Sequence, residues 1–96
     1  MLVTLDNLVA LGACRADRAK FLNTFGQSVD VTYDNLVKAY AAKIDVGWWA
    51  ERVFGKAYNE AVAGPRKAYN EAVAGAWKAY EEACARAIVS LVPHDV

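Results

Sequence analysis

The chain has 96 residues, enough for one small domain and too few for a second hydrophobic core of ordinary size. Hydrophobic residues make up 56% of it and aromatic residues 11%, a composition that excludes intrinsic disorder. Eleven basic residues balance eleven acidic ones, with five of each sign in residues 1–48 and six of each in residues 49–96. Such an even distribution contains no basic patch, so we do not expect nucleic acid as a partner.

No segment is typical of export or of membrane insertion. The longest purely apolar runs are a few residues, against the roughly 20 that cross a bilayer. The opening residues lack a basic region and place Asp6 where a signal peptide has its apolar core. Residues 11–14, Leu-Gly-Ala-Cys, have the form of a lipoprotein cleavage box, but without a basic start they indicate the end of a helix. We expect a cytoplasmic protein of a bacterial host, with no membrane partner.

Capping residues and glycines divide the first half of the chain into four predicted helices. Their ranges are about 5–11, 15–25, 33–44 and 46–54. Each begins after a residue whose side chain can accept from the first turn, or ends at a glycine. Residues 27–31 are too short and too polar to predict a strand, and no useful length alternates with period two. The caps and stops are Thr4, Gly12, Gly26, Thr32 and Asp45.

The second half of the chain is an internal repeat with a period of eleven residues. Residues 56–64 recur identically as residues 67–75, and with changes as residues 78–86. Eleven residues make three turns of about 3.67 residues, close to the roughly 3.6 of a straight α-helix. One face is apolar, in steps of 4, 4 and 3 residues, while lysines and glutamates four residues apart indicate a solvated opposite face. We call the first face the apolar stripe, and its members are Phe54, Tyr58, Val62, Pro65, Tyr69, Val73, Ala76, Tyr80, Cys84, Ala87 and Leu91.

The Gly64-Pro65 pair conflicts with a continuous helix. Proline in a helix interior removes a backbone hydrogen bond and costs about 3 kcal/mol, and glycine costs about 1 kcal/mol more. The stripe nevertheless keeps its phase through the pair. Two structures are compatible with this pattern: a break with a hairpin, which puts Pro65 in a first turn, or a kinked continuous helix. We expect the kinked helix.

The predicted fold class is therefore all-α, with short N-terminal helices packed on a long C-terminal repeat helix. We expect residues 1–96 to form a single helical domain. Residues 1–55 are its short-helix cap, residues 56–91 its repeat helix and residues 92–96 its tail.

The sequence offers no group of residues suited to catalysis or to holding a cofactor. The only histidine, His94, lies in the terminal tail, and no base lies near a candidate nucleophile. The six glycines stand alone, so no phosphate-binding loop is present. Cys14 and Cys84 lie seventy positions apart without metal-ligand spacing, and we expect both to be reduced, buried thiols. We predict that the protein is not an enzyme and has no catalytic, cofactor-binding or metal-binding residues.

Aromatic residues are the main indication of function. Trp, Tyr and Arg are enriched in the hot spots of protein interfaces, and this chain has three Trp and five Tyr. Core packing is the alternative role for the tryptophan pair and for the tyrosines of the repeat. The candidate partner-binding residues are Trp48, Trp49, Tyr58, Tyr69, Trp77 and Tyr80.

The apolar stripe also predicts self-association. A helix over residues 48–91 would span about 65 Å at roughly 1.5 Å per residue, more than the short helices can cover. A long row of exposed apolar side chains is rare on soluble monomers. We therefore expect a homodimer whose seam lies at Tyr69 and Val73.

Two further functions are open alternatives. The first is a structural protein that self-associates through the apolar stripe. The second is a helix-turn-helix regulator, because residues 36–54 have the outline of that motif. The second helix of this segment carries Trp48 and Trp49, whereas a recognition helix presents polar and basic side chains.

Two stretches of the sequence resemble proteins of one group. Residues 8–16, Leu-Val-Ala-Leu-Gly-Ala-Cys-Arg-Ala, and residues 21–26, Phe-Leu-Asn-Thr-Phe-Gly, resemble the openings of small proteins encoded in bacteriophages and prophages. The tandem Lys-Ala-Tyr-Asn-Glu-Ala units are similar to arrays in the same group, and the likeness covers over half of the chain. Here the Gly-Pro pair occurs at one junction only, since Ala76 stands at the next.

The resemblance implies a phage or mobile-element origin and supplies no catalytic residues. Small non-enzymatic phage proteins commonly bind and inhibit a host protein complex, and anti-CRISPR proteins, which block a CRISPR effector, are the sharpest example. The expected partner is therefore a host protein complex, on an argument by analogy.

Overall fold

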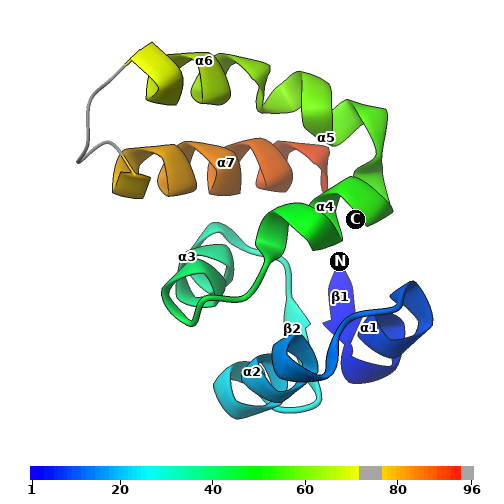
Figure 1. Cartoon of the computed structure of the whole chain (residues 1–96). Coiled ribbons are helices and arrows are strands. Elements are labelled where there is room, and N and C mark those ends of the chain that lie inside the picture. Colours follow the sequence, from blue (N-terminus) through cyan, green and yellow to red (C-terminus); the bar gives the residue numbers. More distant parts are fainter. Residues whose placement is uncertain (72–76, 94–96) are drawn as a thin grey trace.

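The computed structural model describes the chain over residues 1–71 and 77–93, and side chains over residues 1–67 and 78–93. Its principal extents are 37 × 30 × 22 Å. These ranges contain seven helices and two short strands, so the fold is mainly helical, and the two strands are absent from the predicted all-α class. In chain order the elements are β1 (Leu2–Thr4), α1 (Leu5–Leu11), α2 (Arg15–Phe25), β2 (Ser28–Asp30), α3 (Tyr33–Ala41), α4 (Val46–Phe54), α5 (Lys56–Ala61), α6 (Ala63–Glu71) and α7 (Trp77–Leu91) (Figure 1).

Helix α1 shows how local sequence sets the helix ends. The Oγ1 atom of Thr4 accepts from the backbone N–H of Asn7 at 3.1 Å, and Asn7 Oδ1 accepts from the N–H of Thr4 at 3.0 Å. This reciprocal capping box fixes the first turn. Gly12 ends the helix with a φ of 87°, a left-handed conformation that glycine adopts without strain. The predicted bounds of this helix, residues 5–11, are confirmed.

Helix α3 is three residues shorter than predicted. It starts at Tyr33, after Thr32 has accepted from the backbone of Asn35 at 3.2 Å, but it ends at Ala41. The reason is Lys43, whose φ of 64° is left-handed and cannot continue a helix. Lys20 Nζ donates to the carbonyl of Lys43 at 3.0 Å, so α2 holds the turn in place.

A two-stranded antiparallel sheet is an element that the sequence did not predict. β1 and β2 pair in the register Leu2 with Asp30, Val3 with Val29 and Thr4 with Ser28. Each strand has only three residues, too few to show a period of two, and the pairing joins segments that lie far apart in sequence. The side chain of Val3 enters the core at 6% exposure.

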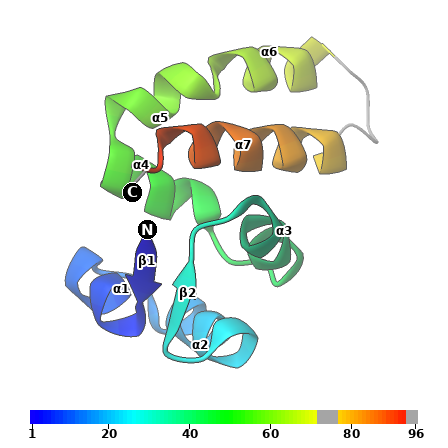
Figure 2. The same ribbon diagram turned by 180° about the vertical axis from the view of Figure 1, so that it is seen from behind.

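The repeat region is a helical hairpin and not one helix. Helices α5 and α6 lie side by side with α7, in the front view and in the view from behind (Figures 1 and 2). The prediction of one kinked helix over residues 56–91 is therefore wrong. The alternative, a hairpin that reverses at Gly64-Pro65, is also wrong, because both residues lie inside α6. The two arms are α5 with α6, which ends at Glu71, and α7, which begins at Trp77.

Pro65 produces a break without a reversal. It lies in the first turn of α6, where its missing N–H would have no intrahelical partner in any case. In a continuous helix the ring of Pro65 would clash with the carbonyl oxygen of Ala61, four residues earlier. Helix α5 ends at Ala61, and Val62, between the two helices, has a φ of −97° and a ψ of 2°. The pair thus bends the chain between α5 and α6.

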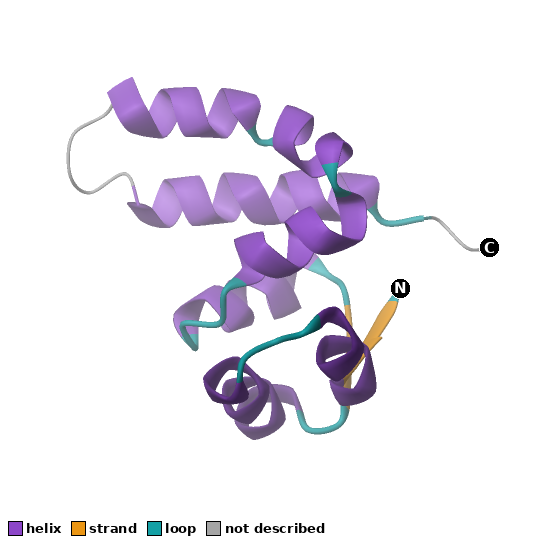
Figure 3. Ribbon diagram, turned by 45° about the vertical axis from the view of Figure 1, so that its right-hand side comes forward, coloured by secondary structure: helices purple, strands orange, loops and turns teal. Residues whose placement is uncertain are grey.

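The hairpin buries three members of the apolar stripe within the chain. Tyr58 and Val62 on one arm are 3% and 0% exposed, and Cys84 on the other is 1% exposed. Burial of one such aliphatic or aromatic side chain contributes roughly 1.5–3 kcal/mol, which explains why the chain folds back. The hairpin forms one end of the molecule, and α1, α2 and the strands form the other, with α3 and α4 between them (Figure 3).

Candidate interaction surface

Helix α4 presents an arginine stacked on a tryptophan. The guanidinium carbon of Arg52 lies 4.8 Å from the centroid of a Trp48 ring. The two residues are four positions apart on the helix, so one face carries both. Arg52 is exposed and Trp48 is half-buried, which leaves the stacked pair accessible from solvent. Such a contact orients the guanidinium and stabilises the pair by about 0.5–1 kcal/mol at an exposed site.

An apolar groove lies beside this pair. It has a volume of about 340 Å³, and the next positions of the same helix, Trp49 and Val53, form one wall. Leu2 and Met1, which also line the groove, are 56% and 40% exposed, so the groove continues into exposed apolar surface. The main apolar residues that line the groove are Met1, Leu2, Ala10, Leu11, Trp49 and Val53.

The predicted partner-binding residues fall into two groups. Trp48 is on the surface as described, whereas Trp49 and Tyr58 belong to the core at 7% and 3% exposure. The ring of Trp49 packs edge-on against Phe54, with 5.8 Å between the centroids. Core packing, the alternative role for these residues, is what the structure shows for Trp49 and Tyr58.

The structure does not describe the side chains at three predicted positions. They are Val73, which is not described at all, and Tyr69 and Trp77, whose backbones belong to helices but whose side chains are not described. The predicted dimer seam at Tyr69 and Val73 is therefore not placed by the structure.

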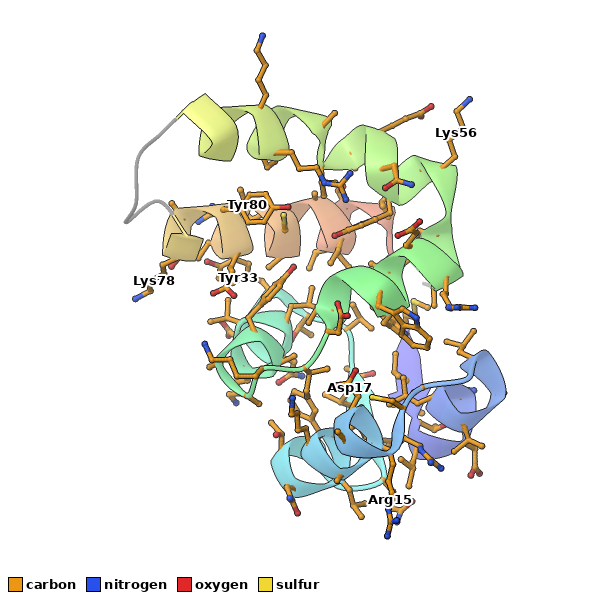
Figure 4. All side chains as sticks on the ribbon, viewed as in Figure 1. Arg15, Asp17, Tyr33, Lys56, Lys78 and Tyr80 are labelled. Carbon is orange, nitrogen blue, oxygen red and sulfur yellow. The ribbon has the colours of Figure 1, made fainter. Side chains whose placement is uncertain are left out.

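Tyr58 and Tyr80 meet at an arginine between the arms of the hairpin. Tyr80 points from α7 towards α6, while Lys56 and Lys78 point away from the hairpin (Figure 4). The guanidinium carbon of Arg66 lies 5.8 Å from the centroid of the Tyr58 ring. Its Nη1 atom donates to Asn59 Oδ1 at 3.4 Å. Arg66 thus connects α6 to α5, and a hydrogen bond to Tyr80, which raises the pKa of Arg66, connects it to α7.

Burial governs the ionisation of this cluster. It raises the pKa of the Tyr58 and Tyr80 hydroxyls above their usual value, and the neighbouring Arg66 partly offsets the rise. Tyr40 on α3 faces the same cluster, and burial raises its pKa far above the usual range. The pKa of the Cys84 thiol is also raised by burial, so the thiol is neutral and a poor nucleophile.

The two cysteines differ in exposure. Both are free thiols, and Cys84 is buried as predicted. The prediction of a buried thiol is wrong for Cys14, which is exposed. Cys14 occupies the N-cap position of α2, in the short connection after Gly12, and its side chain makes no capping hydrogen bond.

Within the described ranges, no three His, Cys, Asp or Glu side chains are grouped so that they could hold a metal ion. In the same ranges, no helix has both the length and the apolar character needed to cross a membrane.

The sequence analysis did not predict three contacts between an arginine guanidinium and an aromatic ring. Besides Arg52 and Arg66, Arg86 on α7 lies over the ring of Tyr33 on α3, with 5.2 Å between the guanidinium carbon and the centroid. The spacing of Trp48 and Arg52 was visible in the sequence as an i,i+4 pair. The other two contacts join different helices, and nothing local in the sequence indicates them.

Comparisons with known proteins found no family model that matches the chain, no similar curated protein and no similar solved structure.

Proposed function

We propose that this protein binds and inhibits a host protein complex, and that it performs no chemistry of its own. The observation that carries the proposal is the Arg52–Trp48 stack beside the apolar groove. Tryptophan and arginine are the side chains that contribute most at protein interfaces, especially next to apolar contacts that exclude water.

The helix that presents the stack is rigidly held. Asp45 Oδ1 accepts from the backbone N–H of Trp48 at 3.1 Å and caps the first turn. Val46 and Ala50 on the inner face are 3% and 0% exposed. A surface that is already ordered loses little conformational entropy on association, which favours tight binding.

The target class rests on the resemblance to phage and prophage proteins. A CRISPR effector in the bacterial cytoplasm is the first host complex to test, because anti-CRISPR proteins are small, bind without catalysis and come from the same mobile elements.

The test is a pull-down from host lysate with the purified protein, followed by a DNA-cleavage assay with the purified effector. Arg52→Glu removes the stack and reverses a charge at the surface. Lys56→Glu makes the same charge change at an exposed residue, 3.8 Å from Glu60, on the outer face of the hairpin. We expect one stoichiometric host partner that Arg52→Glu loses and Lys56→Glu retains. Equal capture by both variants would contradict the proposed surface.

The two alternatives make different predictions in the same experiment. A structural protein that self-associates through the apolar stripe would recover only itself. A helix-turn-helix regulator would bind duplex DNA with an affinity that falls steeply with salt. In α4 the inward positions, such as Trp49, are apolar, and the guanidinium of Arg52 is stacked on Trp48. No observation favours either alternative over the proposed function.

A further inference from the structure

A second apolar hollow lies among the two strands and helices α1 to α4, next to the groove described above, because Val3 and Trp49 line both. It has a volume of about 60 Å³. We call it the β2–α3 pocket. Its walls are rigid, because Phe21, Leu36 and Val46 are 4%, 6% and 3% exposed and belong to three different helices. The pocket is preformed and does not require the core to open.

The exposed edge of the pocket carries one carboxylate. Asp30, at the end of β2, is the one lining residue that is exposed among those described. Asn35 Nδ2 donates to the backbone carbonyl of Asp30 at 3.0 Å and so fixes the rim. Asp34, in the first turn of α3, is exposed and adjacent to Asn35 in sequence. In the described part of the chain, no cation lies within ion-pair distance of Asp30 or Asp34.

We propose that the β2–α3 pocket receives one aliphatic side chain from a protein partner, in a segment where a lysine or arginine follows that residue. The inference rests on the proposed function and names the chemistry of the partner. The volume suits the end of a single side chain, since drug-sized ligands occupy about 300–1,000 Å³ and a cavity of about 150 Å³ holds benzene. Asp30 supplies the complementary charge for the basic residue.

Synthetic peptides test this directly with the full-length protein. The probes are acetylated, amidated Gly-Leu-Lys-Gly, Gly-Leu-Glu-Gly and Gly-Gly-Lys-Gly, titrated into methyl-labelled protein and followed by NMR. We expect the Leu-Lys peptide to shift the methyl signals of Val3, Leu8 and Leu36 in a saturable way. The Leu-Glu peptide should bind at least about two-fold more weakly, because it lacks the ion pair. The Gly-Lys peptide should not shift these methyls.

Matched variants separate the pocket from the rest of the surface. Ala39 lines the pocket, so Ala39→Val fills it and should abolish the shifts. Ala57→Val makes the same change at an exposed position of α5 and should leave binding unchanged. Asp30→Asn should weaken the Leu-Lys peptide by about two- to five-fold. Circular dichroism confirms that each variant is folded.

Three outcomes overturn the inference. They are an absence of shifts at the pocket methyls, equal affinity for the Leu-Lys and Leu-Glu peptides, and unchanged binding by Ala39→Val. The pull-down distinguishes a pocket that binds no side chain from a protein that binds no host complex. A host complex captured by Ala39→Val but not by Arg52→Glu would keep the function and remove the pocket from it.

Discussion

The guanidinium of Arg66 lies over the ring of Tyr58, with 5.8 Å between the guanidinium carbon and the ring centroid. The two residues belong to different helices, α6 and α5, which meet at Val62. Because Arg66 also bonds to Tyr80, one side chain spans the break in the chain and the gap between the hairpin arms.

Arg66→Ala should destabilise the protein by about 0.5–1 kcal/mol, the usual contribution of a cation–π contact at an exposed site. Urea denaturation measures the free energy of unfolding. The control is Lys67→Ala, the next residue along the helix, which is exposed and should cost less than about 0.5 kcal/mol. An equal loss in both variants would contradict the proposed contribution of the arginine.

The protein should lose stability above about pH 10, the pKa of tyrosine in an unfolded chain. Burial raises the folded-state pKa of Tyr40 and Tyr58, so the folded state keeps protons that the unfolded state gives up. The stabilisation is fully present below the unfolded pKa and declines as the pH rises above it. Urea unfolding between about pH 8 and 11 should show this decline, and Tyr40→Phe should reduce it. A stability that does not change over this range would contradict the predicted linkage.

Val62→Ala should destabilise the protein by about 1.5–3 kcal/mol, because this side chain is 0% exposed at the centre of the hairpin. Val9→Ala makes the same chemical change at a position that is 51% exposed, and should cost less than about 0.5 kcal/mol. Thermal unfolding of the two variants provides the comparison. Similar melting temperatures would mean that the hairpin arms do not pack as described.

The homodimer stays a prediction. Tyr58, Val62 and Cys84 of the apolar stripe are buried within the chain, while the side chains of the predicted seam, Tyr69 and Val73, are not described. A dimer with this seam would have twice the 10.5 kDa mass of the chain in light scattering, and Tyr69→Glu with Val73→Glu should dissociate it. A wild-type mass of 10.5 kDa would show instead that the hairpin covers its own stripe.

Local chemistry predicted the first half of the fold well. Thr4, Gly12 and Asp45 act within one turn of their own position, and the helices that they bound lie where their residue types indicate. The buried thiol of Cys84 was predicted, whereas the burial of Tyr58 matches core packing, the alternative to its predicted role in partner binding.

The errors arose where distant segments decide the structure. The strand at Leu2–Thr4 exists because β2 pairs with it, and three residues carry no periodicity of their own. The fold-back exists because α5 and α7 bury each other, whereas the repeat pattern is the same for a straight helix and for a hairpin. The stacks of Arg66 on Tyr58 and of Arg86 on Tyr33 require knowing which helices are neighbours.

The position of α7 in the chain has a consequence for synthesis. This helix is synthesised after α3 and α5, yet it packs against both of them. Until Ile88, which is 0% exposed in the finished fold, has been added, the apolar faces of those helices have nothing to cover them. The nascent chain is therefore prone to aggregate in the interval between the synthesis of α3 and the synthesis of α7.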